Sequence, residues 1–288
     1  MVPTALRVIT LPQLSDNTFF LLREFIYELT GIYFQDHKKY LLEARLGKRL
    51  QIYNMEDFEQ YYRFLKHDPR GTVELKYLYD SITIKETSFF RNLSQFDAFE
   101  NSLYPALYRA KASNGQMPIR IWSAGSSSGE EAYTVAMIYL EKLMPQYRGI
   151  PFEVVGTDIS PFVIEVARKG VYRENSLRNM PEYYRSKYMV QEGVNFRVKD
   201  EVKKFVKFEN VNLYNSQQMR QMKNFDVIFC CNVLIYFDAK SKMQVTSDLY
   251  SSLNHGGYLC IGYAETLHGI SGAFKVINLP KTISYLKE

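Results

Sequence analysis

The sequence lacks the features that mark several classes of protein. Its three cysteines, Cys230, Cys231 and Cys260, show no metal-ligand spacing, so we expect reduced thiols in a core and no metal site. No run approaches the roughly 18 apolar residues of a membrane-spanning helix, and the first 13 residues lack the basic start and long apolar stretch of a signal peptide. These absences predict a cytoplasmic protein without direct membrane insertion.

The sequence also has little excess of charge of one sign. A formal net charge of +5 on 288 residues is far below that of a nucleic-acid-binding surface, and we expect no nucleic acid partner. Hydrophobic residues make up 46% of the chain, enough to bury a large core in one large or two modest domains.

Residues 1–79 have the pattern of a small helical domain. Apolar residues recur there at helical spacing, and strand patterns are absent. Asp16 is placed to cap the first helix, Gly31 to end it, and residues 68–71 form a later break. We therefore predict an N-terminal helical domain.

Residues 80–288 have a different pattern, in which short β-branched runs alternate with helical segments. This alternation predicts an α/β domain with a parallel, Rossmann-like sheet covered by helices on both faces. The predicted strands are residues 119–123, 152–157, 206–211, 225–231 and 258–262.

One stretch, about residues 188–210, departs from this alternation. Residues 195–199 and 202–206 alternate apolar and polar side chains on either side of Asp200 and Glu201. That pattern predicts an antiparallel hairpin in a small antiparallel β subdomain inserted beside the main sheet.

A ligand-binding turn is predicted after the first strand, where the small residues 123–129 precede a helix that begins at Glu130 or Glu131. A dinucleotide site would carry three spaced glycines, whereas this turn has Gly125 and Gly129, and the two carboxylates would repel a pyrophosphate. S-adenosylmethionine has no phosphate and carries an ammonium and a sulfonium, which a carboxylate complements. The alternative is that the glutamates only stabilise the helix start through its dipole.

Polar residues follow the ends of three further strands. Asp158 lies ~20–30 residues past the glycine turn, where a carboxylate receives ribose hydroxyls in this architecture, although it can also serve local capping beside residues 160–161. Residues 212–213 and 231–232 end two other strands at the edge where open α/β sheets bind ligands. The asparagines among them either hold parts of the cofactor or form strand-ending turns.

Taken together, these motifs resemble the chemotaxis receptor methyltransferases, the CheR family, over nearly the whole chain. The matching blocks are residues 87–91, 121–124 with 129–131, 157–159, 212–213 and 229–237. The resemblance implies an S-adenosylmethionine-dependent O-methyltransferase that releases S-adenosylhomocysteine. Its implied product is a γ-glutamyl methyl ester on the cytoplasmic helical bundle of methyl-accepting chemoreceptors.

The resemblance also assigns site residues. Arg91 and Tyr236 would border the transferred methyl group as catalytic residues. Cofactor contacts would come from Thr87, Arg91, Ala124, Gly125, Glu131, Asp158, Asn212, Leu213, Cys231 and Asn232. Lys85 stands where better-known members have Asn, Cys231 replaces Arg, and Ala132 replaces Pro. The predicted hairpin is shorter than in enteric members that grip a receptor's C-terminal peptide, so we expect that tether to be missing.

The chemistry of ester formation suits this set of residues. A glutamate carboxylate has an unperturbed pKa near 4.3 and is already a nucleophile at neutral pH, so no general base is needed. Accordingly, the four histidines fall in no acid–base arrangement. Arg91 would orient the carboxylate with its planar fork, and the Tyr236 hydroxyl would donate a hydrogen bond. The alternative roles are a solvated surface charge and a core aromatic.

A basic helix face invites a hypothesis about the partner. Lys38, Arg45 and Arg49 fall close to one face of a predicted helix, which would suit an acidic receptor helix, although such faces are more often simply solvated. Two other functions stay open: a methyltransferase acting on RNA or a small acid, and a noncatalytic regulator that binds the cofactor.

Overall fold

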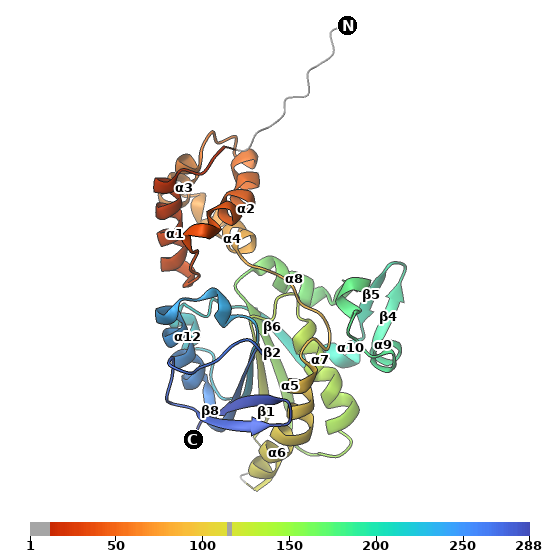
Figure 1. Cartoon of the computed structure of the whole chain (residues 1–288). Helices are drawn as coiled ribbons and strands as arrows, with labels where there is room; N and C mark the ends of the chain where they lie inside the picture. Colours follow the sequence, from red (N-terminus) through yellow and green to blue (C-terminus); the bar gives the residue numbers. More distant parts are fainter. Residues whose placement is uncertain (1–11, 114–116) are drawn as a thin grey trace. The chain divides into compact units, whose positions relative to one another are not determined.

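The computed structural model describes residues 12–113 and 117–288, and divides the chain into two compact units (Figure 1). Of the described residues, the first unit comprises 12–29 and Tyr33–Thr83, and the second comprises Thr30–Ile32, 84–113 and 117–288. The prediction that the chain starts without a signal peptide rests on its first 13 residues, and residues 1–11 lie outside the described part. Within that part, every helix is too short or too polar to cross a membrane.

The first unit is built from four α-helices, which bury apolar side chains such as Leu22, Leu46 and Leu78 against one another. Its helices are α1 (Asp16–Thr30), α2 (Lys39–Ile52), α3 (Phe58–His67) and α4 (Gly71–Ile82), with the 3₁₀ turn η1 (Asp36–Lys38) before α2. Because α3 ends and α4 begins around residues 68–71, the predicted break is confirmed.

The start of α1 differs from the prediction. The backbone N–H of Thr18 donates to Ser15 Oγ over 3.1 Å, so Ser15 caps the helix and Asp16 is its first residue. At the other end, Gly31 follows the helix with φ of +69°, the left-handed conformation that ends helices, as predicted.

The second unit contains a seven-stranded sheet in the order β6-β2-β1-β7-β8-β10-β9. Five strands run parallel, as predicted: β1 (Ile119–Ala124), β2 (Phe152–Asp158), β6 (Val206–Asn210), β7 (Phe225–Cys230) and β8 (Leu253–Ile261). The antiparallel strands β9 (Lys275–Leu279) and β10 (Thr282–Leu286) extend one edge and were not predicted.

Helices cover both faces of this sheet, and successive residues of each parallel strand enter different cores. Ile121 belongs to one buried cluster and Trp122 to the other. The first cluster contains side chains from α5 (Leu93–Ala98), α6 (Tyr104–Ser113), α7 (Glu130–Ile138) and α8 (Pro161–Lys169), with the π-helical turns η2 (Phe99–Leu103) and η3 (Tyr139–Leu143). The second contains side chains from α11 (Ser216–Met219) and α12 (Ala239–Ser252).

A second, three-stranded antiparallel sheet has the order β3-β5-β4. Its strands are β3 (Val171–Arg173), β4 (Met189–Glu192) and β5 (Asn195–Val198), with η4 (Glu174–Leu177) and α9 (Glu182–Tyr188) beside them in the sequence. The small antiparallel subdomain is therefore confirmed, but the pairing predicted for it is wrong. Strand β5 pairs with β4 across Gly193 and with β3, not with residues 202–206.

The reason is that the two halves of the predicted hairpin belong to different structures. Asp200 and Glu201 begin the short helix α10 (Asp200–Lys203), where acidic residues suit the first turn. The chain then enters the main sheet as β6, parallel to β2. Residues 206–210 therefore lie outside the small sheet.

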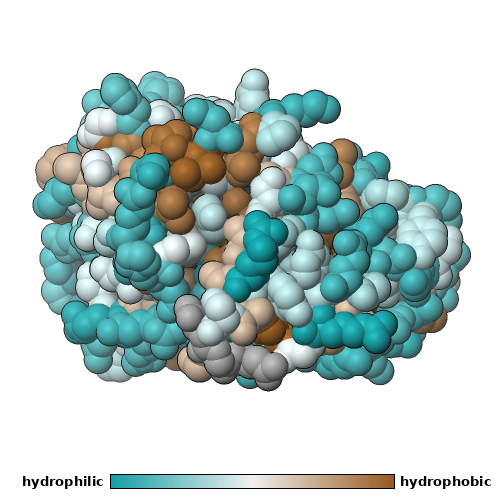
Figure 2. All heavy atoms as spheres, turned by 90° about the horizontal axis from the view of Figure 1, so that it is seen from below, coloured by the Kyte–Doolittle hydropathy of each residue, from teal (hydrophilic) through white to brown (hydrophobic). Residues whose placement is uncertain are grey.

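Seen from below, the molecule is mostly hydrophilic, with one area where apolar residues gather (Figure 2).

Candidate active site

The turn after β1 requires glycine at two positions. Gly125 and Gly129 have φ of +73° and +92°, and a Cβ atom on Gly125 would lie 2.5 Å from Cγ2 of Val233. The N–H of Ser126 donates to the carbonyl of Thr157 over 2.7 Å, which holds the turn against the end of β2. The predicted cradle at the carboxyl end of the sheet is thus closed by backbone bonds.

Asp158 connects this turn to the next helix. Its Oδ2 accepts from the N–H of Ser127 over 3.0 Å, and its Oδ1 accepts from the N–H of Ser160, at the start of α8, over 2.9 Å. Ser127 has φ of +50°, so the carboxylate stabilises a strained residue. The capping role considered for Asp158 is therefore present, at the strand end where the sequence places a ribose ligand.

The two glutamates at the start of α7 point to different surroundings. Glu131 Oε1 accepts from Ser123 Oγ over 2.7 Å, and its electrostatic neighbours are Cys231, Arg91 and Glu265. Burial raises the pKa of Glu131, although the Ser123 hydroxyl, the Cys231 thiol and the Arg91 charge act in the opposite direction. This carboxylate therefore faces the ends of the strands.

Glu130 lies on the other side of the same helix, because successive helical residues are about 100° apart. It is 1% exposed, and its Oε2 accepts from Ser128 Oγ over 2.8 Å. Burial raises the pKa of Glu130, and hydrogen bonds from Ser128, the Glu130 backbone and Ser176, with the Arg178 charge, partly oppose this rise. Of the two glutamates, Glu131 is therefore the one that faces the strand ends.

A residue that the sequence reasoning missed, Glu265, organises the ends of β7 and β8. Its Oε2 accepts from the N–H groups of Asn232 over 2.7 Å and Gly262 over 2.6 Å, and its Oε1 accepts from Ile235 over 3.1 Å. Asn232 has φ of +61°, and these bonds hold it in that conformation. The available signal was a glutamate three residues after Gly262, just beyond a predicted strand.

Cys231 and α5 complete this corner of the site. The Cys231 thiol donates to Oε1 of the buried Gln95 over 2.8 Å, and Gln95 Nε2 donates to the carbonyl of Ile261 at the end of β8. Burial raises the pKa of Cys231 well above its usual range, and the neighbouring Glu131 adds to the effect. Cys231 is therefore a neutral thiol, and all three cysteines are free.

The segment that carries Arg91 lies against the glycine turn. Ser127 Oγ donates to the carbonyl of Lys85 over 3.3 Å, and the carbonyl of Thr87 accepts from Arg178 Nη1 over 3.4 Å. Arg91 is exposed and donates to the carbonyl of Glu86 over 2.6 Å. These contacts place residues 85–91 beside the turn and Arg91 within electrostatic reach of Glu131.

Asn212 and Leu213 follow β6 and differ in their surroundings. Asn212 Oδ1 accepts from the N–H of Tyr214 over 3.0 Å, which is the strand-ending turn considered from the sequence. Leu213 and Ala124 are buried in the second core cluster. Tyr236 is half-buried and ends the 3₁₀ turn η5 (Leu234–Tyr236), next to Ile235, whose N–H Glu265 holds.

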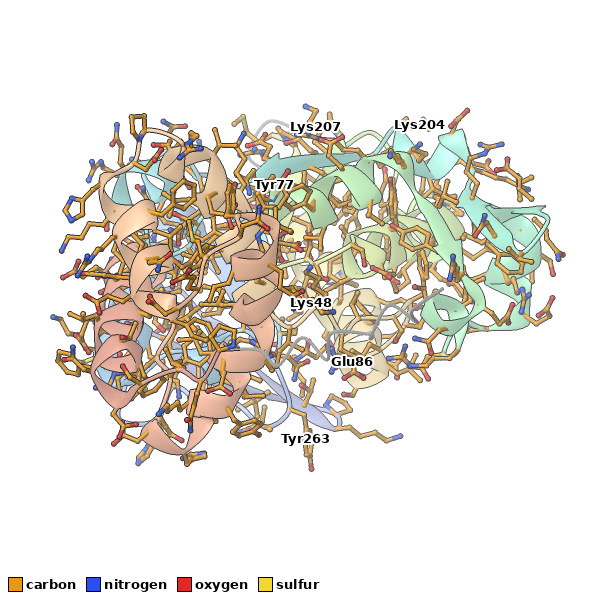
Figure 3. All side chains as sticks on the ribbon, turned by 90° about the horizontal axis from the view of Figure 1, so that it is seen from above. Lys48, Tyr77, Glu86, Lys204, Lys207 and Tyr263 are labelled. Atoms are coloured by element: carbon orange, nitrogen blue, oxygen red, sulfur yellow. The ribbon has the colours of Figure 1, made fainter. Side chains whose placement is uncertain are left out.

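The three basic residues predicted to contact a substrate lie in the helical unit, where two of them have internal partners. Arg49 Nε and Nη2 donate to Glu74 over 2.7 and 2.6 Å, and Glu74 is fully buried. This bond raises the pKa of Arg49. Arg45 Nη1 donates to the carbonyl of Ile82 over 2.6 Å, and Lys38 is half-buried. Lys48, which lies on α2 with Arg45 and Arg49, is exposed (Figure 3).

Comparison with known proteins gives consistent matches over both units. A family model described as CheR methyltransferase, SAM binding domain, matches residues 85–283, and one described as CheR methyltransferase, all-alpha domain, matches residues 17–83. The chemotaxis protein methyltransferase of Borreliella burgdorferi is 38% identical over 245 residues, 85% of this chain and 86% of that protein.

Two relatives from Vibrio cover still more of the chain. Chemotaxis protein methyltransferase 2 of Vibrio cholerae is 31% identical over 275 residues, which are 95% of this chain and 94% of that protein. The chemotaxis protein methyltransferase of Vibrio parahaemolyticus is 33% identical over 275 residues, 94% of this chain and 97% of that protein.

Proposed function

The chain belongs to the CheR methyltransferase family and is an S-adenosylmethionine-dependent protein-glutamate methyltransferase, and we propose that its substrate is the cytoplasmic helical bundle of a chemoreceptor. The protein would then act in the cytoplasm, where such bundles lie. The relatives are chemotaxis protein methyltransferases, which supports a chemoreceptor as the methyl acceptor.

The observation that carries the site assignment is the position of Glu131. A largely buried carboxylate at the carboxyl end of β1, bonded to a neutral hydroxyl, favours a cationic ligand over a phosphate. We assign Glu131 to the ammonium of the cofactor and Asp158 to its ribose. The remaining proposed contacts are Thr87, Arg91, Ala124, Gly125, Asn212, Leu213, Cys231 and Asn232.

The chemistry requires alignment more than proton transfer. When bound, S-adenosylmethionine supplies an electrophilic methyl group and leaves as S-adenosylhomocysteine. The substrate carboxylate is anionic at neutral pH, so the residues of this chain have to hold it in line. Arg91 is exposed and would orient the carboxylate through its fork of N–H donors. Tyr236 would donate a hydrogen bond from its hydroxyl.

Receptor recognition would also involve the helical unit. On α2, Arg45 and Arg49 use their guanidinium groups inside the unit, so their part in binding would be to shape this surface. The exposed Lys48 and half-buried Lys38 would then supply the positive charge for an acidic receptor helix. We expect Lys48→Glu to weaken receptor binding in a pull-down or calorimetric titration, with unchanged affinity for S-adenosylhomocysteine.

A radiolabelled methyl-transfer assay on a purified receptor bundle tests the function. We expect incorporation of base-labile label, absent when the target glutamates are replaced. Tyr236→Phe should lower kcat by about 10- to 100-fold, the size expected for losing one hydrogen bond to a charged group, without changing the affinity for S-adenosylhomocysteine. Alkali-stable label would indicate nitrogen methylation, and binding without transfer would indicate a noncatalytic regulator. Either result would refute the proposal.

A further inference from the structure

Three large apolar side chains are exposed on three segments, two of which carry the proposed methyl-transfer residues. Tyr263 is 94% exposed, Leu93 is 53% exposed and Ile235 is 49% exposed. Leu93 lies two residues after Arg91, and Ile235 immediately precedes Tyr236. Figure 3 shows the side chain of Tyr263 pointing outward from the loop after β8.

Hydrogen bonds hold the three segments that carry these side chains together. Glu265 accepts from the N–H of Ile235 over 3.1 Å and from that of Gly262, the neighbour of Tyr263, over 2.6 Å. Gln95, two residues after Leu93, donates to the carbonyl of Ile261. The exposed side chains therefore belong to one braced region at the carboxyl edge of the sheet.

We propose that Leu93, Ile235 and Tyr263 form an apolar rim that binds the receptor helix carrying the target glutamate. The expected partner is an amphipathic α-helix with apolar residues three or four positions from that glutamate, on the same face. This inference rests on the proposed function, and adds to it the surface that the substrate helix contacts.

The size of a helix makes contact with this rim necessary. A helix with its side chains is about 10–12 Å across, and a glutamate side chain is too short to hold its own helix away from the protein. When the carboxylate reaches Arg91 and Tyr236, the helix must therefore cover the residues beside them. Those residues expose apolar surface on segments that hydrogen bonds hold together, and exposed apolar surface of this kind marks interaction sites. Tyrosine is among the residues enriched in binding hot spots.

The test compares Tyr263→Ser and Leu93→Ser with Val194→Ser as a matched control. Val194 is 79% exposed in the turn between β4 and β5, remote from the rim in the sequence. With a receptor fragment limited to the helical bundle, Tyr263→Ser should lower kcat/KM by about tenfold, which is typical of truncating an interface tyrosine. Leu93→Ser should act in the same direction. Val194→Ser should leave kcat/KM unchanged, and all three variants should bind S-adenosylhomocysteine normally.

A double-mutant cycle adds a readout that general loss of structure would not produce. Replacing the apolar receptor residues beside the target glutamate by serine should cost less in Tyr263→Ser than in the wild type, because the contact is already lost. Wild-type kcat/KM in Tyr263→Ser, additive effects in the cycle, or loss of S-adenosylhomocysteine affinity would each overturn the rim. Failure of the wild type to methylate the bundle would overturn the proposed function as well.

Discussion

The carboxylate of Glu131 is half-buried where we propose that a cation binds, and the replacement Glu131→Gln separates its effects on stability and on binding. The amide keeps an oxygen to accept the 2.7 Å hydrogen bond from Ser123, so the change removes charge with little change of shape. In the cofactor-free protein, we expect the variant to be more stable than the wild type at neutral pH. Its affinity for S-adenosylhomocysteine, which keeps the ammonium group, should fall.

The sign of the stability effect follows from the direction of the pKa shift. Burial raises the pKa of Glu131 in the folded state above its unfolded value of about 4.3. The folded state then binds the proton more tightly, so stability falls as pH rises from about 4.3 through the raised folded pKa. At neutral pH the ionised carboxylate is therefore a destabilising feature of the empty protein, and glutamine removes it.

The size of the binding effect follows from the bond that is lost. A hydrogen bond to a charged group contributes roughly 1.5–3 kcal/mol, which corresponds to about a 10- to 150-fold weaker affinity. Wild-type affinity should also decline as pH falls through the pKa of Glu131, and the corresponding dependence should be absent in the variant. Calorimetric titration and thermal unfolding, both across pH, measure these quantities.

The neighbouring residue supplies a matched control. Glu130 is buried with a raised pKa and accepts a hydrogen bond from Ser128, but it faces away from the strand ends. Glu130→Gln should therefore also stabilise the empty protein, while leaving the affinity for S-adenosylhomocysteine unchanged. Equal loss of affinity in both variants, or unchanged affinity in Glu131→Gln, would refute the assignment of Glu131 to the ammonium.

Three further predictions test other parts of the protein. Gly125→Ala should destabilise the protein in urea by more than the about 1–2 kcal/mol expected for a left-handed alanine, and by more than Gly193→Ala, where a Cβ meets nothing within 4 Å. Glu74→Ala leaves Arg49 without its buried partner, so it should lower the free energy of unfolding, measured in urea, by about 3–5 kcal/mol. Replacing Arg49 as well should make this loss smaller. Glu265→Gln should misplace the loops that Glu265 holds, and should therefore lower kcat by about 10- to 100-fold at saturating cofactor. Glu209 is an exposed glutamate on β6, and Glu209→Gln should leave kcat unchanged.

The main sheet could be predicted because both its faces are buried. Strands such as β7 are buried throughout and mostly apolar, so they stand out from the helical segments between them, and the glycine turn after β1 follows from the spacing of small residues. The hairpin of β9 and β10 is partly exposed and turns at Lys281 with φ of +61°, a residue that rarely signals such a turn. Its pattern is therefore weak in the sequence.

Partners that are distant in the sequence explain the other failures. An alternating pattern indicates a strand but not its neighbour, so the sequence pairs β5 with the wrong segment. Arg49 lies on a basic helix face, yet its partner Glu74 is 25 residues away on another helix. Glu265 reaches Asn232 across 33 residues. Each of these contacts depends on tertiary packing, which spacing along one chain does not encode.

The carboxylates at the strand ends differ in how their charge is compensated, and this difference suggests how the site selects its ligand. Asp158 accepts two backbone N–H bonds, and Glu265 accepts three. These bonds hold the backbone of the neighbouring loops, so the two carboxylates brace those loops. Glu131 accepts from a neutral hydroxyl, and burial raises its pKa although the Cys231 thiol and the Arg91 charge oppose the rise. A cationic ligand gains most binding energy beside the carboxylate whose charge is least compensated by the protein. The charge of the ligand should therefore be recognised mainly at Glu131.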